Sequence, residues 1–388
     1  MRISKEEFIT RIELIQACMI ERKLNSIAVY GDEYRKENLR YVCNFWPIFE
    51  RGICIIPAKG KPIFLGAPEG ELYAREMCIW DDIRNVRELT CVSVSEEIDY
   101  PLAAFSSFKQ VLEEILHGGK RLGVVGMYDM PECILQKIAK AVPSLELIDA
   151  GNILNELRLI KTPAEIECLR RAGELACLGY AELIKNAIPG NTERQAAGAA
   201  EGVARMSGAE DINFMVFGSG TRTQTIIGRP TEKIIADGDM IMAAMAVQYE
   251  GYVATVEFPF VAGKASDRQK RFLGALFEAA NVQLKYLKDG VVAGDMVKAV
   301  KAVFNKLHLE EYDVYPPMHG IGLAEAESPY PDANTTYLLK AGMCVNSDIS
   351  LFGHPDGSNR IEEGFVITAS GPESLTPLIR KLCEGFNL

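Results

Sequence analysis

The sequence predicts an α/β protein, in the α+β sense, with one domain over residues 1–155 and a second over residues 156–388. Three observations favour this fold class. The chain has 388 residues, 48% of them hydrophobic, which is enough to fill two ordinary cores. Segments with helical spacing of apolar residues alternate with short β-branched runs along the chain. A strong helix start near residue 162 indicates where the second domain begins.

The first domain opens with an amphipathic helix over about residues 1–23, where charged and apolar residues recur at helical spacing. Beyond it, helical and strand signals follow in mixed order, which is typical of an α/β domain. The predicted strands lie at about 26–30, 52–57, 62–65, 121–126 and 145–148, and the predicted helices at about 69–78, 105–117 and 130–141.

The second domain begins at a helix that the sequence marks clearly. Thr162 is placed to cap it, Pro163 suits the first helical position, and Glu165 completes a capping box. A second box, Thr192 with Gln195, opens the next helix. Further helices are predicted over 267–287 and 295–309, and strands at about 213–218, 240–247, 252–261, 343–350 and 364–369, with Glu362 just before the last strand.

The stretch from Gly238 to Phe260 predicts a β-hairpin. An apolar run of strand length ends at Tyr249, Glu250 and Gly251 supply the reversal, and the run after Tyr252 is rich in β-branched and aromatic residues. Thr255 and Glu257 stand two residues apart on the second strand, so they share a face.

Charge and hydropathy exclude several classes of partner. The net charge is −11 and no block of Lys and Arg occurs, which argues against nucleic acid and against an anionic membrane surface. No apolar run approaches the roughly 18 residues of a membrane span, and the N-terminus lacks the pattern of a signal peptide. We therefore expect a cytoplasmic protein.

Three motifs resemble one enzyme family. They are the hairpin frame, the helix entry Arg158-Leu-Ile-Lys-Thr162, and His319-Gly-Ile-Gly-Leu323. The chain resembles the pita-bread family of methionine aminopeptidase, aminopeptidase P, prolidase and creatinase over about residues 155–380. The first domain resembles the creatinase N-terminal domain more loosely. The resemblance implies a pita-bread catalytic domain behind a creatinase-like α/β domain.

Two positions of the family's two-metal site are changed. In the metallopeptidases each hairpin strand gives one aspartate, and the matching residues here are Ala244 and Thr255. A methyl group offers no lone pair, and a neutral hydroxyl is a poor ligand for divalent ions that favour anionic oxygen. We therefore expect neither metal nor cofactor. A single ion on His319, Asp348 and Glu362 is the remaining metal alternative.

Creatinase, the metal-free member, is more similar at the site. Its two guanidinium-binding glutamates match Glu257 and Glu362, so the resemblance implies that these bind a cation while His319 moves the proton. Retained carboxylates without a metal need a cation, which a cationic substrate would supply. The creatinase catalytic histidine is missing from residues 225–231, and Ala326 stands where the peptidases have a second histidine.

The sequence suggests further contacts to the substrate. The candidates in the second domain are Asp348, Tyr252, Thr255, Arg222 and Arg229. Phe49 and Arg51 match a segment that creatinase extends over its partner's site, which implies a homodimer.

These residues lead to one main hypothesis and two alternatives. The main hypothesis is a metal-independent, creatinase-like hydrolase or lyase that acts on a C–N bond of a small cationic or zwitterionic compound. The first alternative is a metal-dependent Xaa-Pro dipeptidase or aminopeptidase. The second is a catalytically silent pita-bread protein that only binds a ligand.

Overall fold

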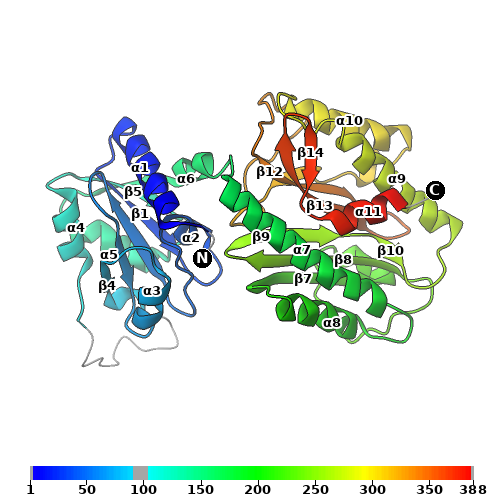
Figure 1. The fold of residues 1–388 in the computed structure, drawn as a ribbon, viewed down its shortest axis with the longest axis horizontal. Helices are drawn as coiled ribbons and strands as arrows, with labels where there is room; N and C mark the ends of the chain where they lie inside the picture. The colour runs from blue at the N-terminus through cyan, green and yellow to red at the C-terminus, as the bar shows by residue number, and fades with distance from the viewer. Residues whose placement is uncertain (1–2, 91–103, 386–388) are drawn as a thin grey trace. The chain divides into compact units, whose positions relative to one another are not determined.

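The computed structural model describes residues 3–90 and 104–385, which form two compact units (Figure 1). The first unit is Ile3–Arg158 and the second begins at Leu159. Each has its own sheet and its own helices, so the predicted mixed α/β architecture is confirmed. Within the described residues no helix is long and apolar enough to cross a membrane.

The first unit is built on a six-stranded sheet in the order β4-β3-β2-β1-β5-β6. Its central strand β1 is buried along its whole length, pairing antiparallel with β2 and parallel with β5. The strands are β1 Ser26–Gly31, β2 Gly52–Pro57, β3 Ile63–Gly66, β4 Ile83–Asn85, β5 Arg121–Val125 and β6 Glu146–Asp149. The helices are α1 Lys5–Glu21, α2 Glu37–Cys43, α3 Glu71–Met77, α4 Phe108–Leu116, α5 Glu132–Ala141 and α6 Gly151–Leu157.

The second unit is built on an eight-stranded sheet in the order β10-β8-β9-β13-β12-β11, with β7 paired to β8 and β14 to β13. All these pairs are antiparallel. The strands are β7 Asp211–Ser219, β8 Met240–Tyr249, β9 Tyr252–Glu257, β10 Phe260–Val261, β11 Met318–Gly320, β12 Cys344–Leu351, β13 Asn359–Thr368 and β14 Gly371–Ser374.

Helices cover one face of this sheet. The helix α7 packs on β8 and β9, and α9 packs on β12 and β13. The predicted capping boxes at Thr162 and Thr192 are both present. The helices are α7 Pro163–Asn186, α8 Glu193–Met206, α9 Asp267–Gln283, α10 Ala293–Lys306 and α11 Pro377–Gly385 (Figure 1).

Side chains alternate between the two faces of a strand, so the residues on the face without helices can be identified from those in the core. Met245, Val256 and Ile361 belong to the core beneath the helices. Because neighbouring residues of a strand point to opposite faces, Ala244, Glu257 and Glu362 point away from that core. The face turned from the helices therefore carries the acidic residues that the sequence singled out.

Three sequence-based boundaries differ from the structure. The last long strand begins at Asn359 rather than near residue 364, so Glu362 lies inside it instead of in the turn before it. His319, which we expected on the loop that links the strands, lies on the short strand β11. The predicted strand 252–261 is broken after Glu257, because Pro259 has no N–H to donate to a sheet ladder.

Candidate functional site

One row of residues crosses four strands of the second unit. Strand pairing places Ala244 opposite Glu257, Glu257 opposite Glu362, and Glu362 opposite Asp348. Residues opposite one another on antiparallel strands have Cβ atoms roughly 4.5–5.5 Å apart. The strand pairing therefore forms a cluster of three buried carboxylates from residues distant in the sequence, namely Glu257, Asp348 and Glu362.

An arginine that sequence reasoning missed neutralises this cluster. Arg360 lies two residues before Glu362 on β13 and so shares its face. Its Nε lies 3.3 Å from Glu257 Oε2, and its Nη1 lies 3.4 Å from Asp348 Oδ2 and 3.1 Å from Glu362 Oε1. The expectation that a substrate cation must balance these carboxylates is therefore wrong, because the chain supplies a guanidinium itself.

Burial dominates the protonation of this cluster. It raises the pKa of Glu257 well above its usual value, and Arg360 offsets only part of that effect. It also raises the pKa of Glu362 to about 8. For His319 burial lowers the pKa, but the negative charges of Glu325, Glu362 and Asp348 outweigh burial and leave it raised.

His319 and a second missed residue, Glu325, complete the site. The Nδ1–H of His319 donates to the carbonyl oxygen of Gly320 at 3.0 Å, since a carbonyl can only accept. Its Nε2 is then free to bind a ligand and lies 3.8 Å from Glu325 Oε1. The hydroxyl of Thr255 donates to the same Glu325 oxygen at 3.0 Å and so fixes the carboxylate in place.

His319, Glu325 and Glu362 lie close enough together to bind one metal ion. One donor atom from each of His319, Glu325 and Glu362 lies within 4.8 Å of the other two. Imidazole and carboxylate donors suit Zn²⁺, Fe²⁺ and Mn²⁺, and a backbone carbonyl that holds the other imidazole nitrogen is the usual support of a metal-binding histidine. A single ion therefore fits, on a set in which Glu325 takes the place expected for Asp348.

Two carboxylates of the cluster, those of Asp348 and Glu362, line a pocket of about 550 Å³ that lies wholly in the second unit, whereas Glu257 lies beneath its surface, fully buried. His319, Glu325 and Arg360 line it as well. Its remaining wall is largely apolar and aromatic, formed by residues that include Phe214, Val216, Ile227, Tyr315, Pro316 and Tyr330. A small ligand with one apolar and one polar part suits such a pocket.

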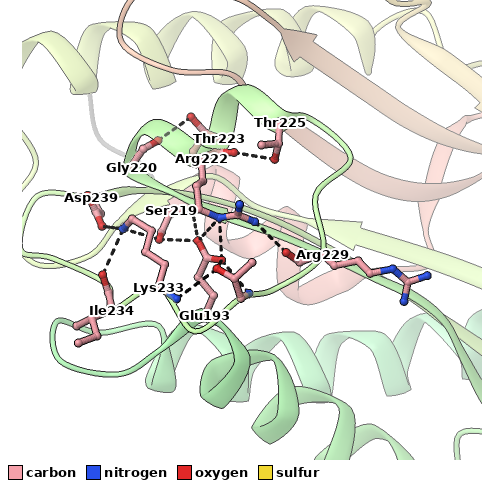
Figure 2. A network of polar contacts seen from close by, with 11 residues as sticks. Glu193, Ser219, Gly220, Arg222, Thr223, Thr225, Arg229, Lys233, Ile234 and Asp239 are labelled. Carbon is pink, nitrogen blue, oxygen red and sulfur yellow. Dashed lines mark hydrogen bonds and ion pairs between the residues drawn. The ribbon is translucent and has the colours of Figure 1, made fainter.

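The two candidate arginines of the second unit are placed differently. Arg229 lines the pocket. Arg222 instead contacts Glu193, with its Nε 3.1 Å from Glu193 Oε2, and its Nη2 donates to the backbone oxygen of Arg229 at 2.9 Å. Figure 2 shows the Arg229 side chain extending away from this network. Arg222 therefore supports the loop rather than facing the ligand.

The remaining candidates lie outside the pocket. Tyr252 is buried and donates to Glu165 Oε1 at 2.8 Å, which ties β9 to α7. Phe49 and Arg51 belong to the first unit, where they line a separate pocket of about 300 Å³. Arg51 donates there to the backbone oxygen of Thr90 at 3.3 Å.

Comparisons with known proteins agree with this architecture. Residues 167–369 match metallopeptidase family M24, and residues 11–160 match the Creatinase/Prolidase N-terminal domain. The chain is 28% identical over 329 residues to the Xaa-Pro dipeptidase of Pyrococcus furiosus, covering 84% of this chain and 90% of that protein. It is 27% identical over 323 residues to the Xaa-Pro aminopeptidase of Escherichia coli, covering 72% and 73%.

A solved structure shows the same fold. The prolidase from Pyrococcus horikoshii OT3 superposes with a TM-score of 0.81 at 22% identity, covering 95% of this chain and 98% of that one.

These findings correct the main functional hypothesis. A metal-independent, creatinase-like activity is wrong, because the similar proteins are Xaa-Pro dipeptidases and aminopeptidases of a metallopeptidase family. Ala244 and Thr255 lack the carboxylates of the family's two-metal site, but Glu325, to which no sequence motif points, supplies another donor. The family resemblance itself is confirmed by both family matches. The chain belongs to metallopeptidase family M24.

Proposed function

We propose that this protein is a peptidase of the Xaa-Pro dipeptidase kind that works with one divalent metal ion. The observation that carries the proposal is the convergence of His319, Glu325 and Glu362, which all line one pocket. The similarity to Xaa-Pro dipeptidases over most of the chain supports the same activity.

The metal site would use nitrogen and oxygen donors only. His319 Nε2 and one carboxylate oxygen each from Glu325 and Glu362 would hold the ion, which would polarise the scissile carbonyl group as a Lewis acid. Thr255 and the carbonyl oxygen of Gly320 keep two of these ligands oriented before an ion arrives.

The pocket suits a dipeptide with a proline residue. Aromatic and aliphatic walls such as Phe214, Ile227 and Tyr315 offer an apolar surface for a pyrrolidine ring. Arg229 lines the same pocket, and within the described residues its guanidinium makes no ion pair with a carboxylate. Its guanidinium is thus available for the carboxylate end of the peptide. A dipeptide is a zwitterion, so this part of the substrate expectation is retained.

Hydrolysis and metal content test the proposal together. Purified protein, stripped with a chelator and reloaded with Mn²⁺, Co²⁺ or Zn²⁺, should hold about one ion per chain and release free proline from Xaa-Pro dipeptides. The chelated form should be inactive. Absence of bound ion and of hydrolysis with all three metals would overturn the proposal.

The role of Arg229 has its own test. Arg229→Gln should raise KM for a dipeptide with a free carboxylate by roughly 10-fold or more, the loss expected for a charged hydrogen bond. The same variant should leave KM for the corresponding C-terminal amide unchanged. An equal effect on both substrates would show that Arg229 does not bind the carboxylate.

We also propose that the protein is a cytoplasmic homodimer. Ile48 and Phe49 leave 55% and 65% of their surfaces exposed on the segment that the resemblance assigns to the partner's site. Exposed apolar side chains beside a pocket favour an interface. Light scattering after gel filtration should give twice the chain mass at micromolar concentration, and a monomer at that concentration would contradict the proposal.

A further inference from the structure

Glu325 lies on a short loop whose two ends are bonded to each other. The N–H of Gly320 donates to the carbonyl oxygen of Glu327, and the N–H of Glu327 donates to that of Gly320, both at 2.9 Å. Between these ends, the N–H of Gly322 donates to the carbonyl oxygen of Ala324 at 3.1 Å. The backbone around Glu325 is therefore closed into a compact turn before any ligand binds.

A buried ion pair fixes this loop to the rest of the second unit. Nζ of Lys161 lies 2.8 Å from Oε1 of Glu327, and the two side chains are 2% and 10% exposed. The other oxygen of Glu327 accepts the N–H of Ala324 at 3.5 Å. A Cβ at Gly322 would lie only 2.5 Å from Oε1, so a side chain there would push the carboxylate away from Lys161. This glycine leaves room for the ion pair two residues from Glu325.

Lys161 is itself held at the start of the helix α7. Its backbone N–H donates to the carbonyl oxygen of Gly342 at 2.9 Å. The next residue, Thr162, is the N-cap of α7 and accepts the backbone N–H of Glu165 in a complete capping box. The ammonium group that binds the loop therefore projects from a helix terminus whose backbone is well bonded.

The same helix terminus also holds the strand that contacts Glu325 directly. Glu165, in the first turn of α7, accepts the hydroxyl of Tyr252 at 2.8 Å, at the start of β9. Three residues further along β9, the hydroxyl of Thr255 donates to Glu325 at 3.0 Å. The end of α7 thus reaches Glu325 by two routes, one through β9 and one through the ion pair and the loop.

We propose that the ion pair of Lys161 and Glu327 positions Glu325 for the metal ion. The inference rests on the proposed metal site, of which Glu325 is one ligand. Shifting the loop would separate two buried opposite charges, which is far more costly than separating exposed ones. Lys161 and Glu327 are positioning residues, because they act through Glu325 and do not themselves bind the ion.

Metal affinity tests the inference. Chelator-treated wild type, Lys161→Met, Glu327→Gln and the double variant would be titrated with Mn²⁺ by calorimetry, after circular dichroism has shown that each is folded. Each single variant should bind Mn²⁺ roughly 10- to 100-fold more weakly, the loss typical of residues that orient a metal ligand. The double variant should lose no more than the weaker single variant, because both changes remove one contact, whereas independent losses would multiply.

Kinetics separate positioning of the ligand from a merely structural role. At the Mn²⁺ concentration that half-saturates the wild type, the variants should hydrolyse an Xaa-Pro dipeptide more slowly, and saturating Mn²⁺ should restore kcat. KM for the dipeptide should not change, because the apolar wall of the pocket is untouched. Lys301→Met is the matched control: Lys301 Nζ lies 2.7 Å from Asp313 Oδ2, and its loss should leave Mn²⁺ affinity unchanged.

A measurement on the wild type needs no variant to fold. Hydrogen exchange would be followed in the chelated protein and again with Mn²⁺ bound. The amides of Gly320 and Glu327 should exchange slowly in both forms, because the loop is already closed without the ion. Protection of these two amides that appears only with Mn²⁺ would overturn the inference.

The titration distinguishes this inference from the function on which it rests. Mn²⁺ affinity of both single variants within about threefold of the wild type, whatever their stability, overturns the inference alone. No Mn²⁺ bound by the wild type overturns the proposed metal site and the inference with it. Weakened binding in the variants, without hydrolysis of any Xaa-Pro dipeptide by the wild type, overturns the proposed function and leaves the inference standing.

Discussion

Two glutamates of the second unit, Glu193 and Glu257, are buried and contact an arginine, yet their carboxylate oxygens are satisfied to very different degrees. Both are 0% exposed. Glu193 accepts hydrogen bonds on both oxygens, from the backbone and hydroxyl of Ser219, the backbone and hydroxyl of Thr231, and Nε of Arg222 (Figure 2). Glu257 makes one ion pair, with Arg360, and its oxygens have no hydrogen-bond partner in the described part of the chain.

This difference distinguishes a structural carboxylate from a functional one. A buried charge whose lone pairs are all used stabilises the local fold and has nothing left to bind. A buried charge with unused lone pairs is costly, and it persists where a ligand completes it. Burial and an arginine partner, which the two glutamates share, therefore do not distinguish them; their hydrogen bonding does.

The largest expected effect falls on the satisfied glutamate. Glu193→Gln turns one acceptor end into a donor that faces the N–H and O–H donors of Ser219 or Thr231. It should lower the free energy of unfolding by about 3–5 kcal/mol, the cost of breaking a buried charged pair. Thermal unfolding followed by circular dichroism measures this.

A matched control is available for this prediction. Glu232→Gln removes the carboxylate of an exposed pair with Arg194, in which both side chains are more than half exposed. It should change stability by less than about 1 kcal/mol. Equal effects of the two variants would show that the Glu193 network is not what stabilises this region.

The next effect concerns activity rather than stability. His319→Asn removes the Nε2 donor of the candidate metal site, so hydrolysis of an Xaa-Pro dipeptide should fall roughly 100-fold or more, about 2.7 kcal/mol in the barrier. The free energy of unfolding of the variant should lie within about 1 kcal/mol of that of the wild type. The measurement is the initial rate at saturating metal, and a rate within threefold of the wild type would place the chemistry elsewhere.

The same substitution at Glu257 should raise stability, whereas at Glu193 it should lower it. Burial raises the pKa of Glu257, which means that its charged form is costly where it lies. Glu257→Gln removes that cost and leaves Arg360 paired with Asp348 and Glu362. We expect the chain without metal to gain about 1 kcal/mol of stability. A loss as large as that of Glu193→Gln would show that the two glutamates play the same structural role.

The fold could be predicted because its signals are local. The boxes at Thr162 and Thr192, and the two-residue reversal Glu250-Gly251 with positive φ at both positions, occupy a few consecutive residues each. Helical and strand periods then identify most elements to within a few residues. The error at β13 arose because Arg360, Glu362 and Glu363 make the start of a buried strand look like a polar turn.

The site could be predicted only in part, because it depends on pairing between distant strands. Glu257, His319 and Glu362 were found through the family resemblance. Arg360 was missed since Glu362 was placed in a turn; had the strand been extended to Asn359, the two-residue period would have put Arg360 on the same face. Glu325 has no local signal, and its role depends on the hydroxyl of Thr255 about 70 residues away in the chain.

The smallest expected effect lies in the first unit and extends the comparison to a half-satisfied carboxylate. Glu50 is buried; its Oε2 accepts the backbone N–H of Gly70 at 2.8 Å, while its Oε1 has no hydrogen-bond partner within the described residues. Burial raises the pKa of Glu50, against the lowering effect of the Gly70 N–H. A group whose pKa is higher in the folded state holds more protons there. Its contribution to stability is therefore complete below the unfolded pKa of about 4.3 and falls as the pH rises through the folded value.

Glu50→Gln should remove this pH dependence and little else, because the amide oxygen still accepts from Gly70. The variant and the wild type should have the same free energy of unfolding in acid, and the variant should become the more stable of the two as the pH rises toward 7. This gain should be smaller than the effects predicted for the other variants. Both tryptophans, Trp46 and Trp80, lie in the first unit, so urea unfolding followed by their fluorescence reports on this unit. A difference that shrinks with rising pH, or one that is constant, would mean that Glu50 is as fully satisfied as Glu193.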